Sequence, residues 1–314
     1  DIHAIASIRS RLSILRRNFD PEIVHIHSLL PHAFFALTAF ANHDSALLVS
    51  RHSASVGGGK AGDYALPRRV LGSARWIACC SRDVLRETCR EVPEIAARCS
   101  VIYNGLSDPG QEPGDLVMDP PHLVCVGRLV RQKGFDVALE AFARVADEFR
   151  GARLTIGGDG PERDSLASQA ESLGIGSSTG FPGWIPPSAV PSLIDTASVV
   201  LVPSRDEEGF GLVALQAAQM ARPVVASGIG GLTEVVVDGE TGVLVEPDDP
   251  GAIAREVSRL VRDPERAAEM GRSGRVRARR EFGGDRFVAQ YIALYGRLLT
   301  DRGAAGEASG EGNP

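Results

Sequence analysis

The stretch VVLVPSRDEEGFGLVALQAA, residues 199–218, decides the fold. It begins with a short apolar run rich in valine, which favours a buried strand. A polar loop that ends in Gly209-Phe210-Gly211 comes next, and an apolar segment that favours a helix follows it. A strand, a glycine-rich turn and a helix in this order form the repeating unit of parallel α/β folds. We therefore predict an α/β protein.

Further strands of the same kind are predicted on both sides of this stretch, in two sets. The C-terminal set lies near residues 122–126, 153–156, 199–202, 223–226 and 242–245, with helices between the strands. This set predicts a complete Rossmann-like domain. The N-terminal set lies near residues 23–27, 46–50, 76–80 and 100–103, which is too few strands for a full doubly wound sheet.

The boundaries of the domains follow from composition. Residues 108–115, between the two sets of strands, contain two prolines and two glycines and favour a linker. We therefore predict an N-terminal domain over residues 1–112 and a C-terminal domain over residues 113–285. Residues 300–314 are rich in Gly, Ala and Glu and predict a disordered tail.

The composition excludes several classes of protein. The 314 residues are 43% hydrophobic and 24% charged, as in a globular protein, and their formal net charge of −6 argues against a nucleic-acid partner. The five cysteines form no C-x-x-C pair and have no histidines spaced around them, which argues against a zinc site or a disulfide framework and favours a reducing cytoplasm. The longest apolar stretch, Leu29–Ala41, falls short of the roughly 20 residues that a membrane span needs, and it predicts a buried helix.

A first candidate site follows the strand at residues 122–126. Ligands of open α/β sheets bind beyond the carboxyl ends of the strands, so the residues after each strand are the ones to consider. Here a loop flanked by Gly127 and Gly134 places Arg128 and Lys133 near the start of a helix, which suits a diphosphate. Lys133 is one of only two lysines among 34 basic residues. A solvated charged loop remains the alternative.

A second candidate site follows the strand at residues 199–202. Gly209 and Gly211 free backbone N–H groups at the start of a helix, where an anion can bind. Glu208 lies at the mouth of this loop and could accept hydrogen bonds from sugar hydroxyls; the alternative is an acidic residue that complements the helix dipole. The glycine-rich turns at residues 157–161 and 227–231 lack the dinucleotide fingerprint, which disfavours a nicotinamide enzyme.

Polar residues also follow strands of the N-terminal set. His25 and His27 are two positions apart and point the same way if the strand is regular. Arg51-His52-Ser53 and Asn104-Gly105 follow the second and the fourth strand. A histidine pair of this kind is often structural, but the carboxyl end of an apolar strand is also where a site residue would lie.

In combination, the motifs resemble the retaining glycosyltransferases of family 4. They are Gly127-Arg-Leu with Lys133-Gly, Pro203-Ser followed by Glu208-Gly-Phe-Gly-Leu, Pro223-Val-Val-Ala-Ser, Gly230-Gly-Leu-Thr-Glu and Asp238-Gly-Glu-Thr-Gly-Val-Leu-Val. The resemblance extends from Pro21 to about Leu299. It implies the GT-B fold, in which two Rossmann-like domains face each other across a cleft and a last helix, here residues 286–299, crosses back to the first domain.

The resemblance also implies roles for the matching residues. Arg128 and Lys133 would hold the diphosphate of the donor and support the departing nucleotide without a bound metal, and Glu208 would contact the hydroxyls of the donor sugar. His27 matches the histidine near the reacting sugar, with His25 as the second choice. The remaining substrate-binding positions are Gly209, Phe210, Gly211, Leu212, Gln216 and Asn104.

The chain departs from the family pattern in two places. The family has a second glutamate, eight residues after the first, for the donor ribose; this chain has Gln216, whose single acceptor oxygen predicts weaker donor binding. The family also begins its first domain with a strand and a glycine-rich loop, and no such segment precedes Asp1. We therefore expect an incomplete first domain.

Together with these residues, the resemblance implies a retaining glycosyltransferase that moves a sugar from a uridine or guanosine diphosphate sugar to a glycan, lipid or small-molecule acceptor. No metal and no cofactor beyond the donor substrate are expected. We predict a cytoplasmic protein and leave peripheral contact with a membrane open. Two alternatives remain. One is a degenerate, non-catalytic nucleotide-sugar-binding protein, motivated by Gln216 and the absent start, and the other is a sugar-nucleotide epimerase of the same fold.

Overall fold

The computed structural model describes residues 2–27, 45–53 and 65–310, and the chain divides into two compact units. Unit 1 consists of Asp1–Tyr103 and Phe287–Pro314, and unit 2 consists of Asn104–Arg286. The helix predicted over Leu29–Ala41 lies outside the described residues. The predicted α/β architecture is present in both units.

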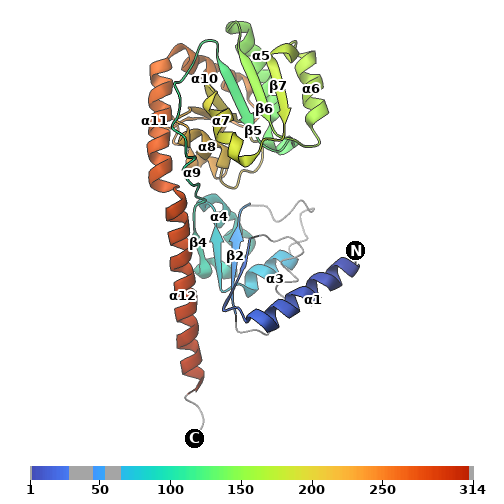
Figure 1. Ribbon diagram of the computed structural model, residues 1–314, viewed down its shortest axis with the longest axis vertical. Coiled ribbons are helices and arrows are strands. Elements are labelled where there is room, and N and C mark those ends of the chain that lie inside the picture. The colour runs from blue at the N-terminus through green and yellow to red at the C-terminus, as the bar shows by residue number, and fades with distance from the viewer. Residues whose placement is uncertain (1, 28–44, 54–64, 311–314) are drawn as a thin grey trace. The chain divides into compact units, whose positions relative to one another are not determined.

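Unit 2 contains a six-stranded sheet with the order β10-β9-β8-β5-β6-β7, in which all strand pairs are parallel. The strands are β5 (His122–Val126), β6 (Arg153–Gly157), β7 (Thr179–Gly183), β8 (Val199–Val202), β9 (Val224–Ser227) and β10 (Val243–Val245), of which Figure 1 labels β5, β6 and β7. The sequence predicts five of them to within one residue. It does not predict β7, because two glycines and a proline disfavour strand structure and are tolerated here only at the sheet edge.

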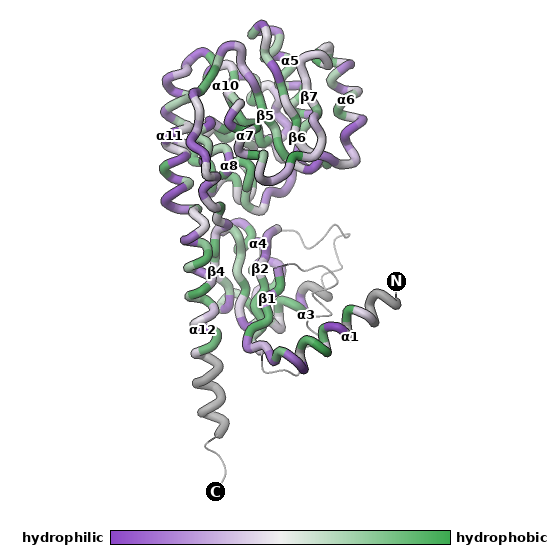
Figure 2. The backbone as a smooth tube through the Cα atoms, in the orientation of Figure 1, coloured by the Kyte–Doolittle hydropathy of each residue, from purple (hydrophilic) through white to green (hydrophobic). Residues whose placement is uncertain are grey.

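Helices cover both faces of this sheet. Leu123 and Cys125 of β5 are buried in one cluster with Phe142 of α5 and Val257 of α10. Val124 points to the opposite face because side chains alternate along a strand, and α7 and α8 contact the strands of the sheet as well. Figure 2 shows the hydrophobic colouring of β5 and β6. The helices are α5 (Phe135–Glu148), α6 (Arg163–Ser172), α7 (Val190–Asp195), α8 (Leu212–Gln219), α9 (Leu232–Val235), α10 (Pro250–Arg262) and α11 (Pro264–Glu281).

The segment predicted as a linker has no regular secondary structure over residues 108–115, but it is fastened to unit 2. The buried guanidinium of Arg222 donates to the carbonyl oxygen of Gly114 at 2.9 Å and to Asp195 Oδ1 at 2.7 Å. The Gly114 N–H donates to the same Asp195 oxygen at 3.0 Å. Arg275 forms an ion pair with Glu112 at 2.7 Å. These contacts hold the segment in one conformation against the domain.

Unit 1 contains a four-stranded parallel sheet with the order β1-β2-β3-β4. The strands agree with the predicted ones to within one residue at their starts and two residues at their ends, and they are β1 (Ile23–Ile26), β2 (Ala46–Arg51), β3 (Trp76–Cys79) and β4 (Cys99–Val101). The helices of this part of the chain are α1 (Ile2–Phe19), α3 (Ala65–Ser73) and α4 (Arg82–Glu91). In the described residues, no helix is both long enough and apolar enough to span a membrane.

Helix α12 (Gly284–Gly310) begins with the last residues of unit 2 and continues as part of unit 1. Its residues Tyr291, Leu294 and Leu298 are buried in one cluster with Leu48 of β2. The helix is longer than the predicted 286–299, so residues 300–310, predicted as part of a disordered tail, are helical.

Candidate functional site

Two loops of unit 2 begin side by side at the carboxyl edge of its sheet. They follow β5 and β8, which are neighbouring parallel strands. The loop after β5 passes through a 3-10 turn, Arg131–Lys133, into α5, and the loop after β8 leads into α8. These are the two loops that the sequence predicts to bind the donor.

The two loops are in direct contact. Gly134 has a φ of +64°, and a Cβ atom placed on it would lie 2.0 Å from the carbonyl oxygen of Pro203, so only glycine fits. The N–H of Arg205 donates to the carbonyl oxygen of Gln132 at 2.9 Å. Because each loop is fixed to the other, the side chains that they carry are brought within reach of one another.

Lys133 and Glu208 form an ion pair between the two loops. Lys133 Nζ donates to Glu208 Oε2 at 2.6 Å, and the hydroxyl of Ser204 donates to the same oxygen at 3.0 Å. The Lys133 side chain is 26% exposed and the Glu208 side chain 13%, so both can still be reached by a ligand. The structure therefore places these two predicted catalytic residues together. Lys133 keeps protons for a further acceptor, and Glu208 keeps its second oxygen for a further donor.

Arg128 lies on the same loop as Lys133 and is exposed. Its neighbour Leu129 anchors the loop, because the Leu129 side chain is fully buried and its N–H donates to the carbonyl oxygen of Asp159 at 2.9 Å. Within the described part of the chain, the guanidinium of Arg128 has no hydrogen bond or ion pair. It is therefore available to an anion that approaches this edge of the sheet.

The segment after Glu208 opens helix α8. Gly211 is the N-cap residue with a φ of +96°, and no side chain among the described residues caps the N-terminus of the helix. The backbone N–H groups of the first turn are thus left for another acceptor. Leu212, the first helical residue, has a 43% exposed side chain.

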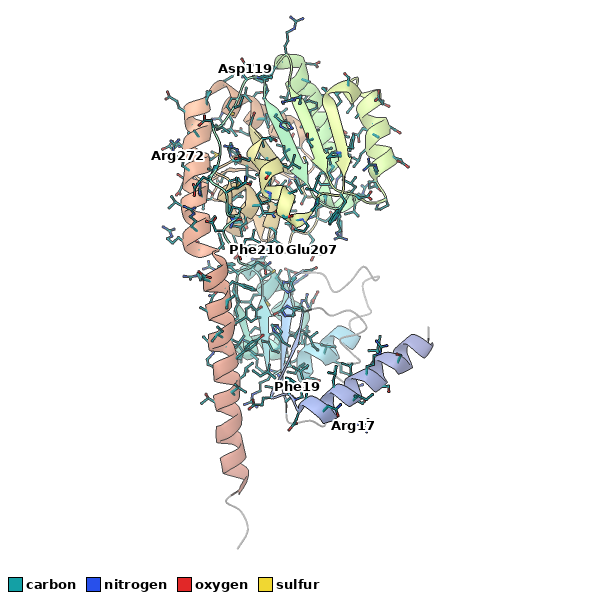
Figure 3. All side chains as sticks on the ribbon, in the orientation of Figure 1. Arg17, Phe19, Asp119, Glu207, Phe210 and Arg272 are labelled. Atoms are coloured by element: carbon teal, nitrogen blue, oxygen red, sulfur yellow. The ribbon has the colours of Figure 1, made fainter. Side chains whose placement is uncertain are left out.

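Phe210 is buried rather than open to a ligand, with 3% of its side chain exposed. Its ring packs edge to face on Phe282, with the ring centroids 5.5 Å apart. The N–H of Gly231 donates to the carbonyl oxygen of Glu208 at 2.8 Å. Figure 3 labels Phe210 and the neighbouring Glu207 on this loop. The side chain of Phe210 therefore belongs to the core of unit 2 and is closed to a ligand.

Gln216 lies on α8, one helical turn beyond Leu212, and is half-buried. Its side chain makes no hydrogen bond to any residue that the structure describes, so its amide is available to a ligand. Asn104 is the first residue of unit 2 and is also half-buried. It lies on the segment that includes Leu106, whose N–H donates to the carbonyl oxygen of Phe282 at 3.0 Å.

The two candidate histidines of unit 1, His25 and His27, differ sharply in their surroundings. His25 bonds through Nδ1 to the hydroxyl of Tyr295 and through Nε2 to the hydroxyl of Ser50, each at 2.7 Å. Burial, followed by the neighbouring His27 and His52, lowers the pKa of His25 to about 4. His27 is exposed and lies 3.4 Å from His52, measured from Nδ1 to Nε2.

The preference for His27 over His25 as a site residue therefore agrees with their accessibility. The ring centroids of the two histidines are 3.9 Å apart, so the two side chains lie on the same side of the sheet and lean toward each other. His25 uses both ring nitrogens within the protein. His27 is exposed, although its ring contacts those of His25 and His52, so a ligand can reach it more easily than His25.

The structure also shows the state of the cysteines and whether the described residues include a group that could hold a metal ion. The five cysteines are all free thiols, and the described residues contain no group of three or more His, Cys, Asp or Glu that is arranged to hold a metal ion. Burial raises the pKa of the Cys79 thiol to about 11. Cys79 is therefore a protonated core residue rather than a nucleophile.

Sequence reasoning misses two residues at this edge of the sheet. Arg205, on the loop after β8, forms ion pairs with Asp136 and with Asp248. Trp184 follows the end of β7 and is 67% exposed. The sequence signal for Arg205 is that it is the single cation in the acidic segment Ser204–Glu208. The signal for Trp184 is its place directly after a strand, and β7 is the strand that the sequence does not predict.

Two known protein families match successive parts of the chain. Residues 111–277 match the family described as glycosyl transferases group 1, and residues 2–108 match the family described as Glycosyltransferase Family 4. Together these matches span both units. The chain belongs to the glycosyl transferases group 1 family.

Curated relatives agree with this assignment. A glycogen synthase of Mycobacterium tuberculosis is 33% identical over 300 residues, which cover 89% of this chain and 70% of that protein. A D-inositol 3-phosphate glycosyltransferase of Acidothermus cellulolyticus is 33% identical over 270 residues, which cover 78% of this chain and 59% of that protein. The chain thus spans the larger part, but not all, of the length of each.

Solved structures show the same fold. The sucrose-phosphate synthase of Thermosynechococcus elongatus superposes with a TM-score of 0.85 at 24% identity, over 95% of this chain and 79% of that chain. The Anabaena HepE protein in complex with UDP and glucose superposes with a TM-score of 0.80 at 18% identity, over 93% and 80%. The fold is therefore that of the GT-B glycosyltransferases, as the sequence predicts.

Proposed function

We propose that this protein is a retaining glycosyltransferase that transfers a sugar from a nucleoside-diphosphate sugar to an acceptor. The observation that carries the proposal is the Lys133–Glu208 ion pair, 2.6 Å long, at the carboxyl edge of the unit 2 sheet. A cation suited to phosphate and a carboxylate suited to sugar hydroxyls are there within one hydrogen bond of each other. A nucleoside-diphosphate sugar carries both complementary groups within a few bonds.

In this proposal the cations act on the leaving group. Lys133 and the exposed Arg128 bind the diphosphate and stabilise the negative charge that grows on it as the bond to the sugar breaks. The uncapped first turn of α8 adds backbone N–H donors, and the loop provides this charge without a metal ion. Glu208 accepts hydrogen bonds from the sugar hydroxyls and orients the ring.

Retention of configuration is part of the proposal and rests on the family resemblance. The acceptor hydroxyl attacks the same face of the sugar from which the diphosphate departs. The departing phosphate oxygen takes the acceptor proton as the new glycosidic bond forms. The protein then contributes positioning and electrostatic stabilisation. By the family resemblance alone, His27 matches the histidine that acts near the reacting sugar.

The donor base and the acceptor class stay open within the proposal. Relatives are named as a glycogen synthase, a D-inositol 3-phosphate glycosyltransferase and a GDP-mannose-dependent phosphatidylinositol monomannoside mannosyltransferase, which supports a glycan, small-molecule or lipid acceptor. The complex of HepE with UDP and glucose supports a uridine diphosphate donor, whereas the mannosyltransferase supports a guanosine diphosphate donor.

A second candidate function is a non-catalytic nucleotide-sugar-binding protein. It is favoured by Gln216, which stands where the family has a glutamate and whose side chain has no partner in the described part of the protein. One acceptor oxygen cannot hold both ribose hydroxyls as a carboxylate can, so the donor would be bound with lower affinity. The two functions differ in turnover rather than in where the donor binds.

The test is an assay of the whole chain with radiolabelled UDP-sugars and GDP-sugars, in which transfer to added acceptors and slow hydrolysis of the donor are both measured. We expect turnover of at least one donor and a marked loss of turnover in Glu208→Gln. The matched control is Glu256→Gln, which removes a carboxylate from the ion pair with Arg259 on α10 and should retain the original rate. Donor binding without any turnover would favour the second candidate, and no binding of any donor would overturn both.

A further inference from the structure

Arg205 makes a fork-shaped contact that joins distant parts of unit 2. Its Nη1 and Nη2 donate to the two carboxylate oxygens of Asp136 at 2.6 and 2.5 Å. Its Nε donates to Asp248 Oδ1, and its Nη1 also reaches the carbonyl oxygen of Arg131 at 3.2 Å. One side chain therefore contacts the first turn of α5, the 3-10 turn before it and the loop that follows β10.

The contact with Asp136 is the strongest of these. The Arg205 side chain is 12% exposed and that of Asp136 is 36% exposed, whereas Asp248 is 57% exposed and its ion pair is more strongly screened by water. Two parallel hydrogen bonds also fix the orientation of the guanidinium, which a single bond does not. The hydrogen bonds to Asp136 are the main cause that raises the pKa of Arg205 above its usual value, so its charge is permanent.

The backbone of Arg205 reinforces the same junction. The N–H of Arg205 donates to the carbonyl oxygen of Gln132. Gly134 lies against the carbonyl oxygen of Pro203, which is two residues before Arg205 in the chain. Gln132 and Gly134 are the two neighbours of Lys133. Glu208 is three residues beyond Arg205 in the chain. The residues that join the two loops are therefore close neighbours in sequence of both members of the Lys133–Glu208 ion pair.

We propose that Arg205 is a positioning residue for the donor site, which sets the relative placement of the two loops and thereby the meeting of Lys133 with Glu208. The proposal rests on the proposed function, in which that pair binds the donor. Arg205 itself needs no contact with the donor, because both ends of its guanidinium are occupied by protein oxygens.

The positioning role predicts an order among substitutions. Arg205→Gln removes both the charge and the fork. Arg205→Lys keeps the charge, but a single ammonium cannot bind both oxygens of Asp136 in parallel while also reaching Asp248. Compared with Arg205→Gln, we therefore expect Arg205→Lys to recover more of the unfolding free energy than of the affinity for a nucleoside diphosphate.

The first measurement is a double-mutant cycle read by calorimetric titration with UDP and with GDP. If Arg205 acts through Lys133, Arg205→Gln should weaken binding of the preferred nucleotide about tenfold in the original chain. The same change should weaken binding less than about twofold when Lys133→Ala is already present, because the group that it positions is gone. Equal losses in both backgrounds, or no loss in either, would overturn the proposal.

The second measurement does not depend on any nucleotide. The chain has only two lysines, so the rate of acetylation of Lys133 by an N-hydroxysuccinimide ester can be followed by mass spectrometry of a single peptide. Arg205→Gln should release Lys133 from Glu208 and raise this rate severalfold. Arg262→Gln, which breaks an ion pair with Glu148 on the α5 and α10 side of the domain, is the matched control and should leave the rate unchanged.

The outcomes separate the two proposals. If neither UDP nor GDP binds the original chain, the proposed function fails, while the acetylation rate still decides whether Arg205 positions Lys133. If the nucleotide binds and Arg205→Gln changes neither the acetylation rate nor the coupling to Lys133, Arg205 is only a structural ion pair and the inference is overturned.

Discussion

The two units place polar residues at corresponding positions in the fold, near the carboxyl ends of parallel strands, but use them in opposite ways. In unit 2, Lys133 and Glu208 form a charged pair that remains partly exposed, and Arg128 on the same loop as Lys133 has no ion pair with any residue that the structure describes. In unit 1, His25 is held neutral between the hydroxyls of Ser50 and Tyr295.

The two units differ in which parts of the protein supply hydrogen-bond partners to the polar residues near the strand ends. In unit 1, helix α12 packs on the sheet and brings two tyrosines to the histidine, and the hydroxyl of Tyr291 also bonds to that of Ser50 at 2.7 Å. In unit 2, the polar groups at the strand ends come from loops that contact each other. A polar residue at a strand end is therefore a candidate for ligand binding only if it stays accessible and the protein leaves part of its hydrogen-bonding capacity unused.

The largest effect is expected from Gly134→Ala, which tests whether the contact of the two loops builds the unit 2 site. An alanine would be forced to a φ of +64° with its Cβ against the carbonyl oxygen of Pro203, so we expect a loss of more than about 3 kcal/mol of unfolding free energy or a shift of the loops. Urea denaturation and binding of UDP or GDP measure the two effects.

The control for this change is Gly174→Ala. Gly174 has a φ of +72°, but nothing lies within 4 Å of the position of a Cβ atom, so only the backbone strain of about 1 kcal/mol should appear. Equal losses in the two variants would show that the close approach of Pro203 to Gly134 is unimportant.

A smaller effect is expected in unit 1 from His25→Gln. The change disturbs two hydrogen bonds to hydroxyl groups and should lower the unfolding free energy at pH 7 by about 1 to 3 kcal/mol. His27→Gln, at the exposed neighbour, should change it by less than about 0.5 kcal/mol. Denaturation curves of the two variants decide whether His25 is the structural member of the pair.

The change of the unfolding free energy with pH tests the same comparison, because the lowered pKa of His25 predicts its direction. The pKa of His25 is lowered from 6.5 to about 4 in the fold, mainly by burial, so between these values the unfolded chain binds a proton that the folded chain does not. The stability that His25 contributes is therefore present above pH 6.5 and decreases as the pH falls toward 4. This decrease should be smaller in His25→Gln; an identical profile would show that His25 is not held neutral.

The smallest effect is expected from Gln216→Glu in unit 2. A carboxylate can accept from both ribose hydroxyls, so nucleoside diphosphate binding should tighten by about 1 kcal/mol. The matched control is the 2′-deoxy form of the same nucleotide, for which the gain should disappear. Unchanged or weaker binding of the ribose form would remove Gln216 from the ribose site.

Much of the fold and part of the site can be predicted from the sequence. The strands of both units carry strong apolar patterns, and the glycines at positions 127, 134, 209 and 211 identify the loops. Lys133 and Glu208 are predicted separately, and the structure adds that they form a pair across 75 positions of sequence.

The contacts that the sequence does not predict connect residues far apart in the chain. Arg205 acts through Asp136 and Asp248, which are 69 and 43 positions away. The engagement of His25 depends on Tyr295, which is 270 positions away. Local patterns carry no information on such pairs, because packing of the whole unit brings them together.

The central claim is that Lys133 in unit 2 binds the diphosphate of a nucleotide donor, and calorimetric titration of the original chain and of Lys133→Ala tests it most directly. UDP and GDP are compared with UMP and GMP. We predict that Lys133→Ala weakens binding of the preferred diphosphate by about 1.5 to 3 kcal/mol, the value of a lost charged hydrogen bond, and weakens the matching monophosphate by clearly less. Equal affinity of both proteins for the diphosphate, or equal losses for the two nucleotides, would contradict the account.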